Sequence, residues 1–275
     1  MENGSTSQTS PSWPTRWPKG SFSFGWTFAF ICLLAGAFFF AIFIAVIGAY
    51  AWLNLHGQSA GLAAYVSSRG TETNAPVFIA FETAQLAAEA LAVVLILIAL
   101  PRLTHISLRE IGFRAISLRT IGYALTGAAA MVVIADAGAS VILSHYPHAV
   151  HPQLAVKVFE AIKSQPGGLL FFVLFAAVLQ PIAEEMIFRV FVFNLALRYG
   201  GFWVAAIISG GLFGAAHTLM GGTDDVSAAL LAISGIALCW VYYRSRNAYA
   251  SMISHGLFNA FSVALLYYAP KLAGS

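Results

Sequence analysis

The segment GLLFFVLFAAVLQPIAEEMIFRVFVFNLALR, residues 168–198, is longer than one membrane crossing requires, yet it carries Glu184, Glu185 and Arg189 near its middle. A membrane-spanning helix needs about 20 predominantly apolar residues. An ionisable side chain near the centre of the bilayer costs roughly 3 kcal/mol unless it is paired with another group or takes part in the function of the protein. The segment therefore predicts a transmembrane helix that contributes to a functional site.

The composition of the whole chain supports a membrane protein. Of its 275 residues, 59% are apolar and 9% are charged, and the mean hydropathy is +0.80, whereas a soluble domain carries about 25% charged residues. We therefore predict an all-α, multi-pass bundle of transmembrane helices, in the cell membrane if the source is prokaryotic, with membrane lipid around it. The net charge of +3 and the lack of a basic run do not predict a nucleic-acid partner.

Hydropathy predicts seven spans and leaves an eighth, re-entrant segment open. The expected helices cover residues 24–50, 76–100, 120–144, 168–198, 202–219, 225–243 and 248–268. The fourth is long enough that its end should tilt or protrude from the bilayer.

Basic residues predict that the N-terminus is cytoplasmic. With that orientation the cytoplasmic segments hold Arg16, Lys19, Arg102, Arg109, Arg114, Arg119, Arg189, Arg198, Arg244 and Arg246. The opposite side holds Arg69, Lys157, Lys163 and Lys271. The positive-inside rule favours this arrangement over its inverse. Between the third and fourth spans, residues 153–166 have the spacing of an amphipathic helix, lying on the outer membrane surface or simply connecting two spans.

Glu184 and Glu185 should have different roles. Successive helix residues point about 100° apart, so the two carboxylates cannot face one point equally. Glu185 precedes Arg189 by four residues, which is the order and spacing that favour an ion pair. Glu184 is then free to face a cavity, where apolar surroundings make a carboxylate a better base. A purely structural Glu–Arg network is the alternative.

The next span carries a histidine that should lie at the depth of Glu184. Gly200 and Gly201 mark the turn between the two spans. Glu184 is 16 residues before Gly200 and His217 is 16 residues after Gly201. At ~1.5 Å per residue, both lie about 24 Å from the turn. The two side chains should therefore adjoin, with Phe213 one turn away on the same face.

The last span carries His255 and Asn259, four residues apart and so on one face of the helix. Peptide hydrolysis needs fixed donors where negative charge develops, and an imidazole N–H and an amide NH₂ can supply them. Hydrogen bonding between helices is the alternative role for both residues.

Together these residues form three motifs on successive spans: EExxxR at 184–189, FxxxH at 213–217 and HxxxN at 255–259. In this order they resemble the CAAX prenyl protease and bacteriocin-processing (CPBP) family, which includes the type II CAAX prenyl endopeptidases of eukaryotes. The resemblance covers roughly residues 165–265, and residues 107–114 also resemble a family connector.

Composition, hydropathy and the resemblance together divide the chain into three parts. These are a polar, disordered tail over 1–22, N-terminal helices with the amphipathic connector over 23–164, and a catalytic core over 165–268.

The resemblance implies an intramembrane endopeptidase that cuts a membrane-associated protein or peptide. Glu184 and His217 would activate the attacking water, and His255 and Asn259 would stabilise the oxyanion. Glu185, Arg189 and Phe213 would support the site. Whether the substrate is a prenylated C-terminus, a bacteriocin leader or another membrane peptide stays open.

The resemblance favours a mechanism without a cofactor, although zinc is the alternative. Glu184, His217 and His255 could in principle bind zinc and leave one position open for water. The sequence lacks an HExxH pair, and Asn is a poor zinc ligand.

Other ionisable residues suggest rival functions. Glu82, Glu89 and Asp136 lie in the second and third spans and could line an ion path in a small transporter or channel. A catalytically silent membrane scaffold is a third class. We expect His145, His148 and His151 to lie in a solvated loop rather than to bind a metal.

Overall fold

The computed structural model describes residues 24–58, 60–61, 75–104, 107–146, 154–164, 166–221 and 223–268. The predicted tail, His148 and His151 lie outside the described residues. Every regular element in the described part of the chain is a helix. The predicted all-α class is therefore confirmed.

The helices of the described residues follow the predicted spans closely. Five helical segments are long and apolar enough to cross a membrane, and two further apolar helices, Phe40–Leu55 and Phe202–Thr218, are shorter. The first two spans are α1 (Phe24–Leu55) and α3 (Ala75–Thr104), and the last three are α10 (Phe202–Gly221), α11 (Asp225–Ser245) and α12 (Ala248–Tyr268). Each overlaps a segment that hydropathy predicts, so a multi-pass helical bundle is confirmed.

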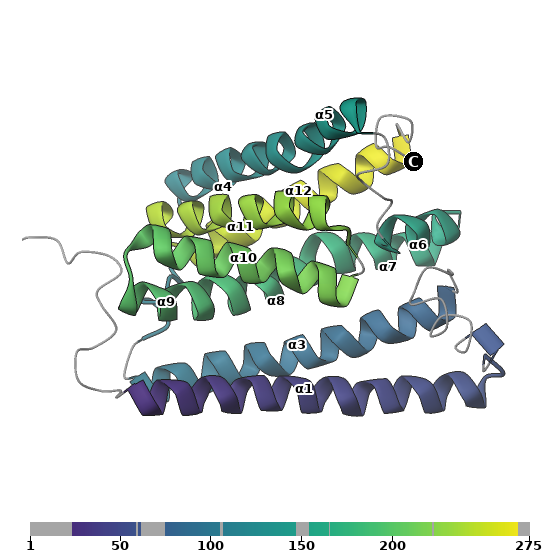
Figure 1. The fold of residues 1–275 in the computed structure, drawn as a ribbon, viewed down its shortest axis with the longest axis horizontal. Helices are drawn as coiled ribbons and strands as arrows, with labels where there is room; N and C mark the ends of the chain where they lie inside the picture. The colour runs from purple at the N-terminus through teal and green to yellow at the C-terminus, as the bar shows by residue number, and fades with distance from the viewer. Residues whose placement is uncertain are drawn as a thin grey trace, which may run out of the picture.

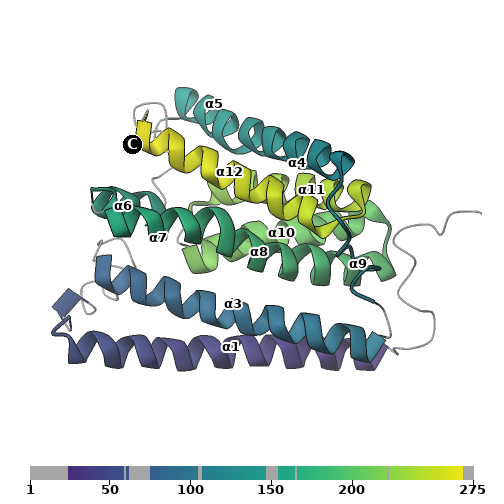
Figure 2. The same ribbon diagram turned by 180° about the vertical axis from the view of Figure 1, so that it is seen from behind.

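The helices lie roughly side by side, as Figure 1 and the reverse view in Figure 2 both show. α1 packs along α3, which separates it from the other spans (Figure 1). α10 packs along α11, and α12 packs along α4 (Leu118–Met131). The fourth span lies between α3 and α12, since its segments contact both. That central place brings its charged residues into the interior of the bundle.

The third and fourth spans are interrupted by π-helical turns, which the hydropathy pattern does not reveal. The third consists of α4, η1 (Val132–Ala137) and α5 (Gly138–His145). The fourth consists of α7 (Pro166–Leu174), η2 (Phe175–Leu179), α8 (Gln180–Glu185), η3 (Met186–Phe193) and α9 (Asn194–Tyr199). A π turn is wider than an α turn, and such turns frequently occur at functional sites. Here two of them flank the glutamate pair.

Glycines allow α10 and α11 to approach very closely. A Cβ on Gly210 would lie 2.6 Å from the carbonyl oxygen of Ala232, and one on Gly214 would lie 2.4 Å from that of Ala228. Both contacts are with backbone, which cannot easily give way. The small-residue spacing at 210 and 214 thus sets the distance between the two helices.

The connector, residues 107–117, folds onto the turn between α11 and α12. The Tyr242 hydroxyl donates to the Ile111 carbonyl oxygen at 2.7 Å, and the Asn247 amide donates to the carbonyl oxygens of Arg114 and Ala115 at 3.2 Å each. Gly112 adopts a φ of 104°, a region that favours glycine. The connector ends at Ser117, whose side chain caps α4. The connector thus fixes the start of α4, the end of α11 and the start of α12 relative to one another.

The predicted amphipathic segment forms α6 (Leu154–Ile162), but its apolar face packs on protein. Phe159 and Ile162 are buried in a cluster with Phe172 and Val263. Glu160 and Lys163, at the end of this helix, form an ion pair. The contacts support the interpretation of α6 as a helix that connects two spans and docks on the bundle.

Candidate active site

Glu184 and Glu185 end α8 and are both buried, with exposed fractions of 8% and 1%. Pro181 stands in the first turn of α8, directly after the π turn η2, and its missing N–H cannot bond back to the preceding turn. The two glutamate side chains leave this helical segment in the interior of the bundle. Neither carboxylate has water to solvate it fully, so its neighbours decide its role.

Glu185 forms the ion pair that its spacing predicts. Its Oε2 lies 3.2 Å from Arg189 Nε, and the arginine side chain is fully buried. The guanidinium also lies over the Phe213 ring, 4.5 Å from its centre, and donates to the carbonyl oxygen of Gly235 at 3.3 Å. Arg189 is thus an interior cation. Counting it among the cytoplasmic charges was wrong, because its i,i+4 partner holds it at the depth of the carboxylates.

His217 comes from α10 and meets Glu184 across the hairpin. Its Nε2 lies 3.9 Å from Glu184 Oε1, and its Nδ1 lies 2.8 Å from the Phe213 carbonyl oxygen. A carbonyl oxygen only accepts, so Nδ1 carries the hydrogen. In the neutral ring, Nε2 then presents its lone pair toward Glu184.

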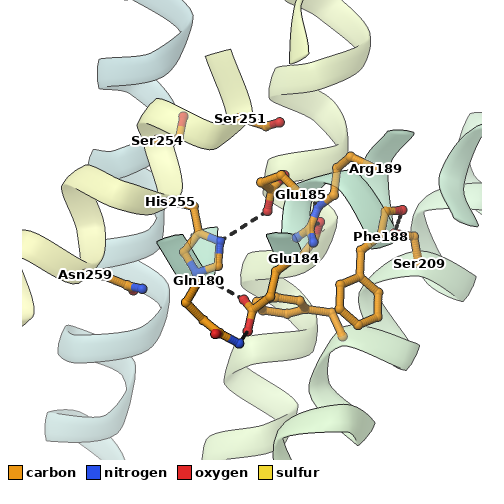
Figure 3. Close-up of polar contacts among 12 residues, drawn as sticks. Gln180, Glu184, Glu185, Phe188, Arg189, Ser209, Ser251, Ser254, His255 and Asn259 are labelled. Carbon is orange, nitrogen blue, oxygen red and sulfur yellow. Dashed lines mark hydrogen bonds and ion pairs between the residues drawn. The ribbon is translucent and has the colours of Figure 1, made fainter. Parts of the chain in front are cut away.

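His255 comes from α12 and lies between the two glutamates, as Figure 3 shows. Its Nδ1 is 3.2 Å from Glu185 Oε1, and its Nε2 is 3.6 Å from Glu184 Oε2. The close approach of α12 depends on Gly256, because a Cβ there would lie 2.5 Å from the Ala177 carbonyl oxygen in η2. The ring is therefore held through Nδ1, and its Nε2 faces Glu184.

Phe213 packs against both histidines, whereas the polar contact described for Asn259 is with the fourth span. The Phe213 ring centre lies 4.6 Å from that of His217 and 5.6 Å from that of His255. The Asn259 amide nitrogen donates to the carbonyl oxygen of Ala176 at 2.7 Å. That oxygen belongs to η2. One amide hydrogen of Asn259 is thus used to hold α12 on the fourth span, and the other is left for a second acceptor.

Sequence reasoning missed a residue in contact with Glu184. Gln180, one turn earlier on α8, donates from Nε2 to Glu184 Oε1 at 2.9 Å and to Glu89 Oε1 at 3.0 Å. Glu89 was predicted only as a member of a separate ionisable set. A polar residue four positions before Glu184 in an apolar span was the available signal.

The other residues of that ionisable set do not join this cluster. Asp136 lies in η1, and its Oδ2 accepts from the Ser262 hydroxyl at 3.5 Å. The side chain of Glu82 lies outside the described part of the structure. His145 is exposed and contacts Ser144 and the Val141 carbonyl oxygen.

The zinc alternative requires three or four ligands around one point, each about 2.0–2.3 Å from the ion. Among the described residues, no group of three or more His, Cys, Asp and Glu side chains is arranged to hold a metal ion. His255 also has its Nδ1 on Glu185 and its Nε2 facing Glu184. Whether Glu184, His217 and His255 bind zinc stays a question for experiment, and the mechanism proposed below contains no metal step.

Elements α3, α8, α10 and α12 thus bring carboxylates, imidazoles and amides to one buried place. A membrane-type helical bundle that holds such a cluster is the arrangement expected of an intramembrane hydrolase. Residues 166–261 match the family model described as type II CAAX prenyl endopeptidase Rce1-like. The match covers about a third of the chain and includes all three motifs. The resemblance is confirmed for this segment, and it supports an intramembrane protease function for a protein integral to the membrane.

No curated protein and no solved structure was found to match the chain.

Proposed function

We propose that this protein is an intramembrane endopeptidase that hydrolyses a peptide bond with a water molecule activated by Glu184. The observation that carries the proposal is the position of one buried carboxylate within 4 Å of two imidazoles from different helices. A family of endopeptidases matches the same segment.

The separation of Glu184 and His217 suits a bridging water. Oε1 and Nε2 are 3.9 Å apart, which is too long for a direct hydrogen bond. A single water can hydrogen-bond to both atoms at ordinary distances. Its two hydrogens would point to Glu184 Oε1 and His217 Nε2, because both atoms accept. The lone pair of the water oxygen is then available to attack a carbonyl carbon.

The positions of the two water hydrogens determine the proton transfers of the proposed reaction. As the water oxygen bonds to the carbonyl carbon, Glu184 takes a proton and the carbonyl π electrons move to oxygen. The oxyanion accepts from the remaining amide hydrogen of Asn259, and from His255 Nε2 when that ring is doubly protonated. Collapse breaks the C–N bond, and protonated Glu184 returns its proton to the leaving nitrogen. Glu185 and Arg189 hold His255 throughout.

The proposed substrate is a membrane-associated peptide or protein with an apolar part. The matching family is described by its action on CAAX prenyl substrates, which makes a lipid-modified C-terminus one candidate and a leader peptide another. An apolar groove of about 320 Å³ lies between α3 and the fourth span, lined by Leu86, Ala90, Val93, Val94, Leu179, Ile182 and Ala183. The lining residue Ala183 directly precedes Glu184 in the chain, and we propose that an apolar part of the substrate binds in this groove.

The test is cleavage of membrane peptides by purified protein in liposomes. Glu184→Ala, His217→Ala and His255→Ala should each lower the rate at least about 100-fold while the protein still folds. Exposed residues of the same types supply matched controls, Glu160→Ala and His145→Ala, which should keep full activity. Newly cut peptides absent from Glu184→Ala membranes would identify the substrate. Wild-type cleavage by all three site variants would overturn the proposal, and ion flux that survives Glu184→Ala would favour a transporter.

A further inference from the structure

Gln180 and Glu89 lie outside the three motifs, yet they connect Glu184 to another helix. Glu89, on α3, is 4% exposed. The Gln180 amide nitrogen donates to Glu89 Oε1 at 3.0 Å and to Glu184 Oε1 at 2.9 Å. Figure 3 shows the amide group of Gln180 directed at the Glu184 carboxylate. The Gln180 side chain therefore joins the proposed base to α3, where Glu89 lies 91 residues before Gln180 in the chain.

The two carboxylates determine which way the Gln180 amide faces. Ionised carboxylate oxygens only accept hydrogen bonds, so the amide nitrogen must point toward them. With the amide turned over, Gln180 Oε1 would face two negative groups. In the described structure Oε1 is buried and has no hydrogen-bond partner, so no other contact competes for this orientation. Both amide hydrogens are used, one on each glutamate.

Gln180 makes the closest of the described polar contacts to Glu184. The contacts from His217 and His255, at 3.9 and 3.6 Å, exceed hydrogen-bond distance. A base must be held in a defined orientation, because a displacement of about 1 Å can reduce a rate by ~10²-fold. We propose that Gln180 is a positioning residue that orients Glu184 toward the attacking water, and that Glu89 anchors the Gln180 amide on α3. This inference rests on the proposed function.

The link crosses the boundary between α3 and the fourth span beside the apolar groove. On α3, the groove-lining residue Leu86 precedes Glu89, and Ala90 and Val93 follow it. On the fourth span, the lining residue Leu179 directly precedes Gln180. A movement of α3 that widens the groove therefore also lengthens the hydrogen bond from Gln180 to Glu89. The orientation of Glu184 is coupled in this way to the packing of α3.

The experiment measures kcat and KM for variants of the full chain in liposomes. Gln180→Met keeps a similar length and removes the donor, so kcat should fall about 10- to 100-fold while KM changes less than about twofold. Glu89→Leu should lower kcat similarly. Glu89→Gln keeps a carbonyl oxygen that can accept from Gln180 and should retain kcat within about threefold. Gln85→Met removes the amide that donates to Glu89 from its own helix, and serves as the matched control with unchanged kcat.

Combining the substitutions separates positioning from general damage. If Glu89 acts through Gln180, Gln180→Met with Glu89→Leu should have the kcat of Gln180→Met alone. Additive losses, or wild-type kcat in folded Gln180→Met, would overturn the inference. Should Gln180→Met not fold, equal kcat values for Glu89→Leu and Glu89→Gln would overturn it instead.

Glu184→Ala in the same assay distinguishes the two levels of the proposal. If Glu184→Ala cleaves like wild type, the proposed function fails and this inference fails with it. If Glu184→Ala is inactive and Gln180→Met is fully active, only the inference about Gln180 and Glu89 is overturned.

Discussion

Replacing Arg189 with methionine should destabilise the fold as well as the site. The side chain is fully buried and forms an ion pair with Glu185 at 3.2 Å. Breaking a buried pair by removing one partner costs about 3–5 kcal/mol, because the other charge stays buried. His255 still contacts Glu185, which reduces this cost, whereas loss of the contact with the Phe213 ring adds up to about 2 kcal/mol. We expect a loss of about 3–5 kcal/mol in the free energy of unfolding.

Denaturant unfolding in detergent micelles measures this loss, and a double variant tests its cause. Glu185→Leu with Arg189→Met removes both charges, so stability should return to within about 1 kcal/mol of wild type. Cleavage should stay absent, because His255 has lost the partner of its Nδ1. If Arg189→Met alone unfolds within about 1 kcal/mol of wild type, the pair is solvated and our account of the interior is refuted.

Three further predictions concern packing, metal and pH. Gly256→Ala should lower the free energy of unfolding by about 1–3 kcal/mol and remove most of the activity, because its Cβ would meet the Ala177 carbonyl oxygen. Gly167→Ala is the control, since a Cβ there meets open space. Equal stability and activity of the two variants would contradict the close packing at Gly256. Protein stripped of metal in chelator should cleave normally, and loss restored by zinc alone would disprove the metal-free route. Hydrogen bonds from the Ser107 hydroxyl and backbone N–H hold the Glu110 pKa below 4.5. These bonds therefore stabilise the connector above pH 4.5, and the stabilisation is lost when the pH falls through the lowered pKa. Hydrogen exchange of the connector should increase over that pH range in the wild type, and Ser107→Ala should remove the pH dependence.

Much of the fold and the main contacts of the site could be predicted from local pattern. Hydropathy locates the spans because each must present about 20 apolar residues to lipid. The i,i+4 spacing of Glu185 and Arg189 corresponds to the ion pair in the structure. Equal distances from the turn at Gly200 and Gly201 correspond to the contact of Glu184 with His217.

The remainder depends on contacts that no local pattern encodes. The π turns of η2 and η3 are a matter of backbone hydrogen bonding, and apart from Arg189 their residues are as apolar as those of an ordinary span. The approach of Glu89 to Gln180 joins helices that are far apart in the chain. Arg189 was counted as cytoplasmic because a count of basic residues takes no account of a buried partner.

The two π segments on either side of α8 make the geometry of the site sensitive to chain length. Each residue of an α-helix advances the direction of the side chains by about 100°. Loss of a single residue within Phe175–Leu179 would rotate the acidic pair relative to the preceding part of the span, or displace it by one position. Hydropathy, charge and all three motifs would be unchanged. A close homologue could therefore keep every motif residue and lack the aligned site, so insertions and deletions in this short segment are as informative about activity as the motifs themselves.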